Sequence, residues 1–182
     1  MSSRPAFDPA RLDVAAFAAG RASIDGRWSL RSLARLAEST LPLADGGEDP
    51  VQWKAEGTLA PLLGAGAQPA LRIVADAAVG LECQRCLQRM VVPLRVDRRV
   101  FFVAGEDAAA SLDADSDDDV LTLEPALDLK SLVEDELLLA LPLVPRHEVC
   151  PEPLPFEAEP EAPASEHPYA ALAAQTRGPA SS

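Results

Sequence analysis

In this 182-residue chain, three cysteines and one histidine have the types and spacing of residues that bind a metal ion or carry out thiol chemistry. Cys83 and Cys86 stand in "LECQRC", and His147 and Cys150 stand in "HEVC". Each short spacer lets both side chains of a pair reach one ion, and tetrahedral Zn²⁺ accepts a Cys3His set. Against zinc stand the 60 residues between Cys86 and His147 and the presence of Leu87 where a glycine commonly lets such a turn form. The pattern favours a structural zinc site over a catalytic one, and it leaves open that the four residues bind nothing.

Thiol redox is a second chemistry for the cysteine pair. Arg85 lies between the two cysteines, and a neighbouring guanidinium group lowers the pKa of a thiol. Thioredoxin-like pairs open a helix within a βαβ unit, whereas the pattern around Cys83 predicts antiparallel strands. A cysteine nucleophile with His147 has no local sequence signature, and His167, beside Pro168, is better explained as a docking contact. The sequence therefore predicts no catalytic residue.

Charged residues are unevenly distributed along the chain. The formal net charge of −13 disfavours non-specific nucleic-acid binding, because that affinity comes mainly from neutralising phosphates. Residues 106–119 hold seven acids and no base, which is typical of a solvated loop but also attracts a basic partner. Residues 85–99 hold five arginines and one acid, and these arginines either contact RNA or another partner or are simply solvated. The candidate contact residues are Arg85, Arg89, Arg95 and Arg99.

Strand and helix signals place these residues in an α+β fold. Alternation of apolar and polar residues predicts half-buried strands at 51–59, 71–83 and 91–103, and a short strand at 120–125 is expected to rejoin the sheet. Apolar residues at helical spacing predict an N-terminal helix at 29–40 and a second helix near 128–141. Because the connections are short, we expect an antiparallel β-meander, or a partly open barrel, packed against these helices.

The second helix contains an acid in an apolar position. Asp128 is the expected N-cap and Pro142 ends the helix, while Glu136 falls near the middle of its apolar face. Glu134 falls outside that face. Arg98 is the one base on the buried face of its strand, so the sequence predicts an Arg98–Glu136 ion pair. If both groups are buried, replacing Glu136 with alanine costs about 3–5 kcal/mol.

The domain organisation follows from the same signals. We expect an N-terminal segment at 1–26, a single domain at 27–150 with a flexible acidic loop at 104–119, and a Pro/Glu-rich tail at 151–182. A short docking helix is expected at about 168–176. The N-terminus lacks the apolar run of a signal peptide, and an odd cysteine count does not make a disulfide framework. These features are typical of a cytoplasmic protein.

Three segments in order, "LECQRC", "LVEDELLLALPLVPRHEVC" and "HPYAALAAQTR", resemble the YceD family, the large ribosomal RNA subunit accumulation proteins of bacteria. The resemblance covers roughly residues 27–177. It implies a non-catalytic ribosome biogenesis factor that supports synthesis, processing or stability of large-subunit (23S) rRNA. The implied partner is that rRNA or its precursor, bound directly or through a basic ribosomal protein. Leu87 and the short spacer between His147 and Cys150 depart from the family pattern, which leaves the metal site open.

Two further functions remain as alternatives at this point. One is a zinc-dependent or thiol enzyme, such as a nuclease or oxidoreductase, that uses the Cys83/Cys86 pair. The other is an acidic interaction domain for a basic ribosomal protein, with no RNA contact of its own.

Overall fold

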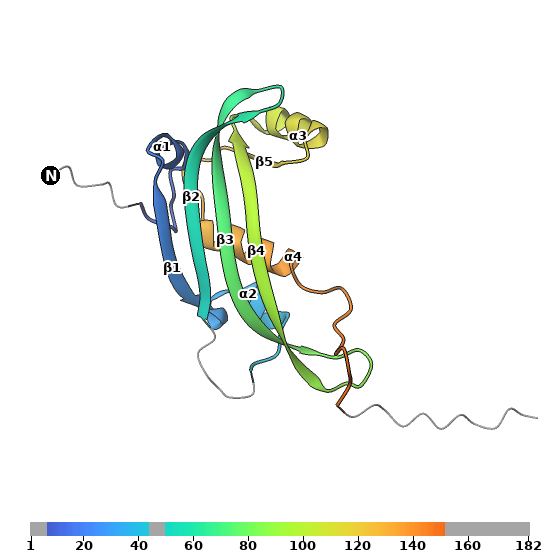
Figure 1. Cartoon of the computed structure of the whole chain (residues 1–182). Coiled ribbons are helices and arrows are strands. Elements are labelled where there is room, and N and C mark those ends of the chain that lie inside the picture. Colours follow the sequence, from blue (N-terminus) through green and yellow to red (C-terminus); the bar gives the residue numbers. More distant parts are fainter. Residues whose placement is uncertain (1–6, 44–49, 152–182) are drawn as a thin grey trace, which may run out of the picture. The chain divides into compact units, whose positions relative to one another are not determined.

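The computed structural model describes residues 7–43 and 50–151 (Figure 1). Its centre is one five-stranded sheet in the order β1-β2-β3-β4-β5. The strands are β1 (Ser23–Ser29), β2 (Pro50–Leu62), β3 (Gly66–Glu82), β4 (Arg89–Val103) and β5 (Asp119–Thr122). The helices are α1 (Val14–Ala19), α2 (Ala34–Glu38), α3 (Glu106–Asp115) and α4 (Leu129–Leu139), with a 3₁₀ turn η1 (Leu30–Ser32) ahead of α2. The sheet is open, and the expected α+β class is confirmed.

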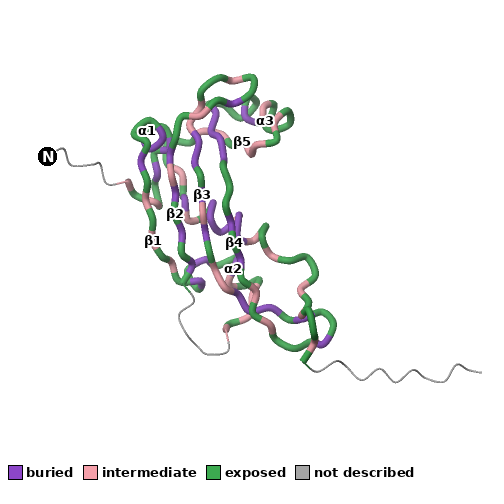
Figure 2. Tube along the Cα trace, viewed as in Figure 1, coloured by how far each residue is buried: buried purple, intermediate pink, exposed green. Residues whose placement is uncertain are grey.

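The period-two pattern determines which face of the sheet is buried. Alternate residues of β2, β3 and β4, among them Val51, Ile73 and Val96, form one apolar core with residues from α1, α2 and α4. We call this the covered face, and its buried positions are purple in Figure 2. Helix α4 lies across the covered face behind β3 and β4 in Figure 1. The intervening residues point to the opposite, open face and are mostly exposed.

The sheet begins earlier in the chain than expected. Strand β1 starts at Ser23 and pairs with β2 along its whole length, so the boundary at residue 26 cuts through a strand. Helix α1, also within residues 1–26, packs Phe17 against β2 at Gly57. A Cβ on Gly57 would lie 2.5 Å from the Phe17 ring, so only glycine allows this close approach. The described residues from 7 to 150 belong to one compact unit.

The acidic segment contains a helix, and this changes the direction of the last strand. Within the expected loop at 104–119, residues 106–115 form α3, which buries Ala109 in a second small core on the open side of the sheet. Alanines favour a helix, and Glu106 and Asp107 suit its first turn, where the helix dipole is positive. Because a helix separates β4 from β5, the chain re-enters the sheet parallel to β4. The expected antiparallel meander is formed by β1 to β4, and the short strand that was expected to rejoin the sheet does so as a parallel edge strand.

One of the two helix predictions is close to the structure and the other is not. Helix α4 spans Leu129–Leu139 with Asp128 as its N-cap, close to the expected 128–141. The expected helix at 29–40 is instead the η1 turn followed by only five residues of α2. Among the residues that the structure describes, none of the helices has the length and hydropathy to cross a membrane. The expected docking helix at 168–176 and His167 lie outside the described residues.

Candidate metal centre and charged surfaces

The four residues singled out as a zinc set come together in space. Cys83 and Cys86 lie in the turn between β3 and β4, and the chain after α4 runs down to that turn (Figure 1). The ligand atoms of Cys83, Cys86, His147 and Cys150 all lie within 4.8 Å of one another. We call these four residues the Cys3His cluster.

The spacing of these atoms matches a tetrahedral zinc site. Cys83 Sγ lies 3.9 Å from Cys150 Sγ, and Cys86 Sγ lies 3.4 Å from His147 Nδ1. With Zn–S bonds of about 2.3 Å, two sulfurs of a regular tetrahedron are about 3.8 Å apart. Cys83 and Cys86 are 0% and 1% exposed, which suits a closed structural site better than one open to substrate.

Leu87 takes the place of the expected glycine without preventing the turn. Its φ is +58°, the left-handed conformation that glycine normally supplies. The turn is closed by two backbone hydrogen bonds, from Leu87 N to Cys83 O and from Cys83 N to Gln88 O, both 2.9 Å. The backbone of this exposed leucine is therefore locally strained, and the strained turn leaves both cysteine side chains buried.

Backbone groups around Cys83 favour its ionised form. Burial alone would raise the pKa of this thiol, but N–H groups of His147, Cys86 and Arg85 surround the sulfur and lower the pKa to about 5. His147 N lies 3.4 Å from Cys83 Sγ. Burial, together with hydrogen bonds to Cys86 and Cys83, raises the pKa of Cys150 to about 11. N–H groups directed at a sulfur are what a metal-bound thiolate needs.

The four arginines singled out as candidate contacts to RNA or another partner fall in two groups. Arg95 and Arg99 lie on the open face, where Arg99 donates to both Asp118 oxygens at 2.8 and 3.1 Å and Arg95 lies 3.9 Å from Asp76. Arg85 and Arg89 lie at the turn that holds the cysteines, and they donate to backbone oxygens: Arg85 to His147 O at 3.5 Å and Arg89 to Pro42 O at 2.5 Å.

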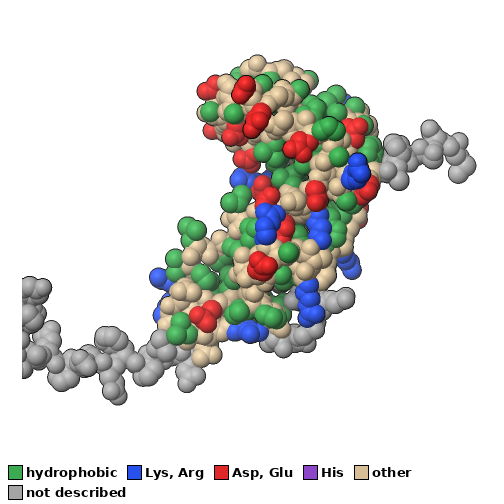
Figure 3. All heavy atoms as spheres, turned by 180° about the vertical axis from the view of Figure 1, so that it is seen from behind, with side chains coloured by type: hydrophobic (Ala, Val, Ile, Leu, Met, Phe, Trp, Pro, Cys, Tyr) green, Lys and Arg blue, Asp and Glu red, His purple; other side chains and the backbone are tan. Residues whose placement is uncertain are grey.

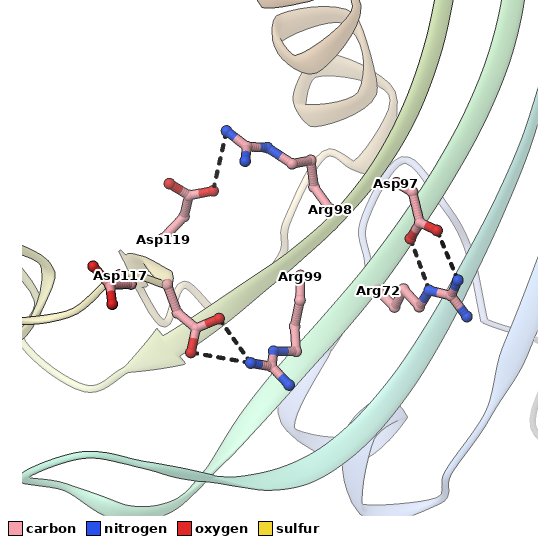
Figure 4. A pocket seen from close by; sticks show the side chains of 7 residues that line it. Arg72, Asp97, Arg98, Arg99, Asp117 and Asp119 are labelled. Atoms are coloured by element: carbon pink, nitrogen blue, oxygen red, sulfur yellow. Dashed lines mark hydrogen bonds and ion pairs between the residues drawn. The ribbon is translucent and has the colours of Figure 1, made fainter.

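Carboxylates balance the basic side chains of the open face. Arg72 and Asp97 form a two-pronged pair with bonds of 2.8 and 2.7 Å, and the Arg72 guanidinium holds the pKa of that carboxyl below its usual value (Figure 4). The open-face bases are Arg27, Lys54, Arg72, Arg95 and Arg99, and its acids are Asp25, Glu56, Asp76, Asp97 and Asp118. Each of these bases stands beside carboxylates, so this face has no excess positive charge for a phosphate backbone.

Acidic side chains gather at the end of the sheet that carries α3. They include Glu106, Asp107, Asp113 and Asp115 of that helix. Figure 3 shows a gathering of red acidic side chains at one end of the molecule. No basic residue lies in the last turn of α3. This end is therefore the negative surface that the sequence led us to expect, displayed on a helix instead of a loop.

Arg98 reaches Glu136 but is not buried. Arg98 Nε lies 3.5 Å from Glu136 Oε2, and its NH2 group lies 3.8 Å from Asp119. The Arg98 side chain is 55% exposed and that of Glu136 only 11%. The expectation of a buried arginine is wrong because, within the described residues, β4 is an edge strand at residue 98 and its pairing with β5 starts only at Val100. Removing Glu136 would leave Arg98 in water, so the large cost expected from the sequence does not follow.

The environment of Glu136 predicts a pH-dependent effect of Glu136→Gln. Burial raises the pKa of Glu136. The positive charge of Arg98 lowers this pKa, while the negative charges of Asp119 and Asp135 raise it further. Because the folded-state pKa lies above the unfolded one, the carboxyl contributes stability below its unfolded pKa and loses it as the pH rises through its folded pKa. The stability difference between Glu136→Gln and the parent should therefore move in favour of the variant from pH 4 to pH 8. Urea unfolding at both pH values measures it, and a constant difference would contradict the prediction.

Glu134 is an important contact that the sequence did not reveal. It was expected outside the apolar face of α4, yet it is buried against α2. Its Oε1 accepts from Leu36 N at 3.1 Å, and its Oε2 accepts from Arg35 NH2 at 3.1 Å. Helix α2 has no side-chain cap of its own, so Glu134 caps it from a residue 98 positions away. The only sign of this contact in the sequence was Arg35, a base between apolar residues of the helix expected at 29–40.

Comparison with protein families gives one match. The family model of the large ribosomal RNA subunit accumulation protein YceD matches residues 71–174, more than half of the chain, including β3 from Leu71 onward, β4, α4 and the Cys3His cluster. No curated protein and no solved structure matches the chain. The match confirms the family resemblance found in the sequence motifs, over residues 71–174 of the roughly 27–177 expected. The chain belongs to the YceD family of large ribosomal RNA subunit accumulation proteins.

Proposed function

We propose that this protein is a non-catalytic, cytoplasmic ribosome biogenesis factor that supports the synthesis, processing or stability of 23S rRNA. The observation that carries this proposal is the family match over residues 71–174. The family description gives a role in accumulation of the large-subunit RNA, not a chemical reaction. Large-subunit rRNA or its precursor is the proposed partner, bound directly or through a basic ribosomal protein.

We further propose that the Cys3His cluster holds a structural zinc ion. The cluster joins the β3–β4 turn to the chain after α4, where Gln84 N also donates to Pro145 O at 2.9 Å. Zinc would supply a cross-link between these two segments and take no part in a reaction. The burial of Cys83 and Cys86, and the presence of four protein ligand atoms, support this role over the alternative of a zinc-dependent or thiol enzyme, because a catalytic site keeps one coordination position open.

Depletion of the protein from growing cells is expected to lower 23S rRNA relative to 16S rRNA. The reason is that an accumulation factor protects or matures only the large-subunit RNA. Quantifying both rRNAs after depletion, with re-expression of the parent chain as control, measures the effect. An unchanged ratio would remove the proposal.

The charge balance of the open face favours contact through a basic ribosomal protein over direct contact of this face with RNA. The double substitution Arg95→Gln and Arg99→Gln should therefore leave association with rRNA within about twofold of the parent, because both arginines already pair with Asp76 and Asp118. Capture of the tagged chain from cells, followed by 23S quantification, is the measurement. Loss of rRNA from the captured material would instead show that these arginines bind RNA.

A further inference from the structure

A groove beside the Cys3His cluster is assigned no role by the proposed function. It has a volume of about 450 Å³ and lies between the end of α2, the end of β3 and the chain after α4. Leu41, Leu81, Leu141, Pro142 and Pro145 supply its apolar surface. These residues come from three segments far apart in the sequence, so the groove exists only in the folded domain.

The walls of the groove are held by specific contacts. Leu41 N donates to Gly80 O at 2.7 Å, which fixes the chain after α2 against β3. A Cβ on Gly80 would lie 2.5 Å from the Leu41 carbonyl oxygen, so glycine is required for this crossing. On the other side, the bond from Gln84 N to Pro145 O and the adjacent Cys3His cluster hold the chain after α4. The groove is therefore formed before a ligand arrives.

Two carboxylates line the groove, and they differ from the open-face acids in their ion-pair partners. Glu38 and Glu82 are exposed, and neither has an ion-pair or hydrogen-bond partner among residues 7–43 and 50–151. Asp76, Asp97 and Asp118 of the open face are each paired with an arginine. Arg89, which faces Glu82 in the strand register, donates instead to Pro42 O. Unpaired negative charge beside an apolar surface is complementary to a basic, apolar peptide.

We propose that this groove binds a segment of a basic protein, with one leucine-sized side chain on the apolar surface and flanking lysines or arginines on Glu38 and Glu82. This inference rests on the proposed function, because a basic ribosomal protein is one of its candidate partners, and it names the site that would receive such a protein. The volume suits one or two side chains of an extended peptide, so the groove recognises a short motif.

The test uses the full chain and a dye-labelled octapeptide made of two leucines, four lysines and two glycines. Fluorescence anisotropy should show salt-sensitive binding of this peptide and much weaker binding when its leucines are serines or its lysines are glutamates. The variant Glu38→Gln with Glu82→Gln should lose about five- to tenfold in affinity, the loss expected for two surface ion pairs. A matched control, Glu106→Gln with Asp107→Asn on α3, removes the same charge elsewhere and should change affinity less than about twofold.

Three results would overturn the inference: no binding of the leucine–lysine peptide, equal binding of the serine–lysine peptide, or equal losses in the two double variants. A cellular experiment separates the groove from the function. Cells depleted of the parent chain and supplied with the Glu38→Gln, Glu82→Gln variant should recover less 23S rRNA than cells supplied with the α3 control. If depletion lowers 23S rRNA and both variants restore it fully, the groove proposal fails while the proposed function stands.

Discussion

Cys86→Ser should abolish stoichiometric zinc binding and lower the stability of the protein. Cys86 is 1% exposed and its sulfur lies 3.4 Å from His147 Nδ1, so a hydroxyl in its place removes one of the four proposed ligands. At free zinc a thousandfold above the dissociation constant, loss of the ion lowers the free energy of unfolding by about 4 kcal/mol. Melting temperatures fall by roughly 2–4 °C for each kcal/mol in a chain of this size. Elemental analysis and thermal unfolding of the purified chain measure both effects.

Cys86 is the better choice for this test because Cys83 also accepts the His147 N–H, so its loss would disturb the turn even without a metal. Glu148→Gln is the matched control, since Glu148 is exposed and lies between two of the ligands without being one. It should keep zinc and melt within about 1 °C of the parent, as surface substitutions usually do. If the parent itself binds no zinc, or if Cys86→Ser keeps it, the metal proposal is wrong.

Glu134→Ala should destabilise the protein by about 2–4 kcal/mol, because it removes a charged, buried hydrogen-bond acceptor. The Leu36 N–H, at the start of α2, would lose its acceptor and have no replacement within its own helix. Arg35 would lose two of its bonds and keep its contact with Asp135. Urea unfolding at neutral pH measures the change.

The neighbouring residue supplies the control for Glu134. Asp135 also pairs with Arg35, but both side chains are 48% exposed, and surface pairs contribute at most about 1 kcal/mol. Asp135→Asn should therefore cost much less than Glu134→Ala. Equal effects of the two substitutions would mean that the cap on α2 contributes nothing beyond a surface charge.

The local periodicity of apolar residues predicted most of the sheet. The features that the sequence did not predict depend on contacts between residues far apart in the chain. The alternating apolar residues around Val51, Ile73 and Val96 identified three strands and their buried face, since a period of two is visible in any one strand. The direction of β5 was missed because it depends on α3, whose alanines carry little apolar periodicity to mark a helix. The burial of Glu134 depends on Arg35, 99 residues away, and no local pattern reports such a partner.

The cluster shows the same division between local and long-range information. Each short pair, Cys83 with Cys86 and His147 with Cys150, is visible in the sequence because its two residues are close together. In the sequence, Leu87 in place of a glycine counted against the turn. In the structure Leu87 adopts the left-handed conformation, with a φ of +58°, and the turn forms. The pairing of the two halves depends on how the chain leaves α4, which is a property of the whole domain.

The Cys3His cluster also has a consequence for the order of events during translation. His147 follows Cys86 by 61 residues, so at about 5–20 residues per second the first two ligands leave the ribosome roughly 3–12 s before the last two. Throughout that interval the nascent chain offers only a pair of thiols, which is half of the proposed zinc site. The site becomes complete only when the final segment of the domain has emerged and returned to the β3–β4 turn. Closure of the cluster would then mark a finished domain, and unfinished chains would remain without the cross-link.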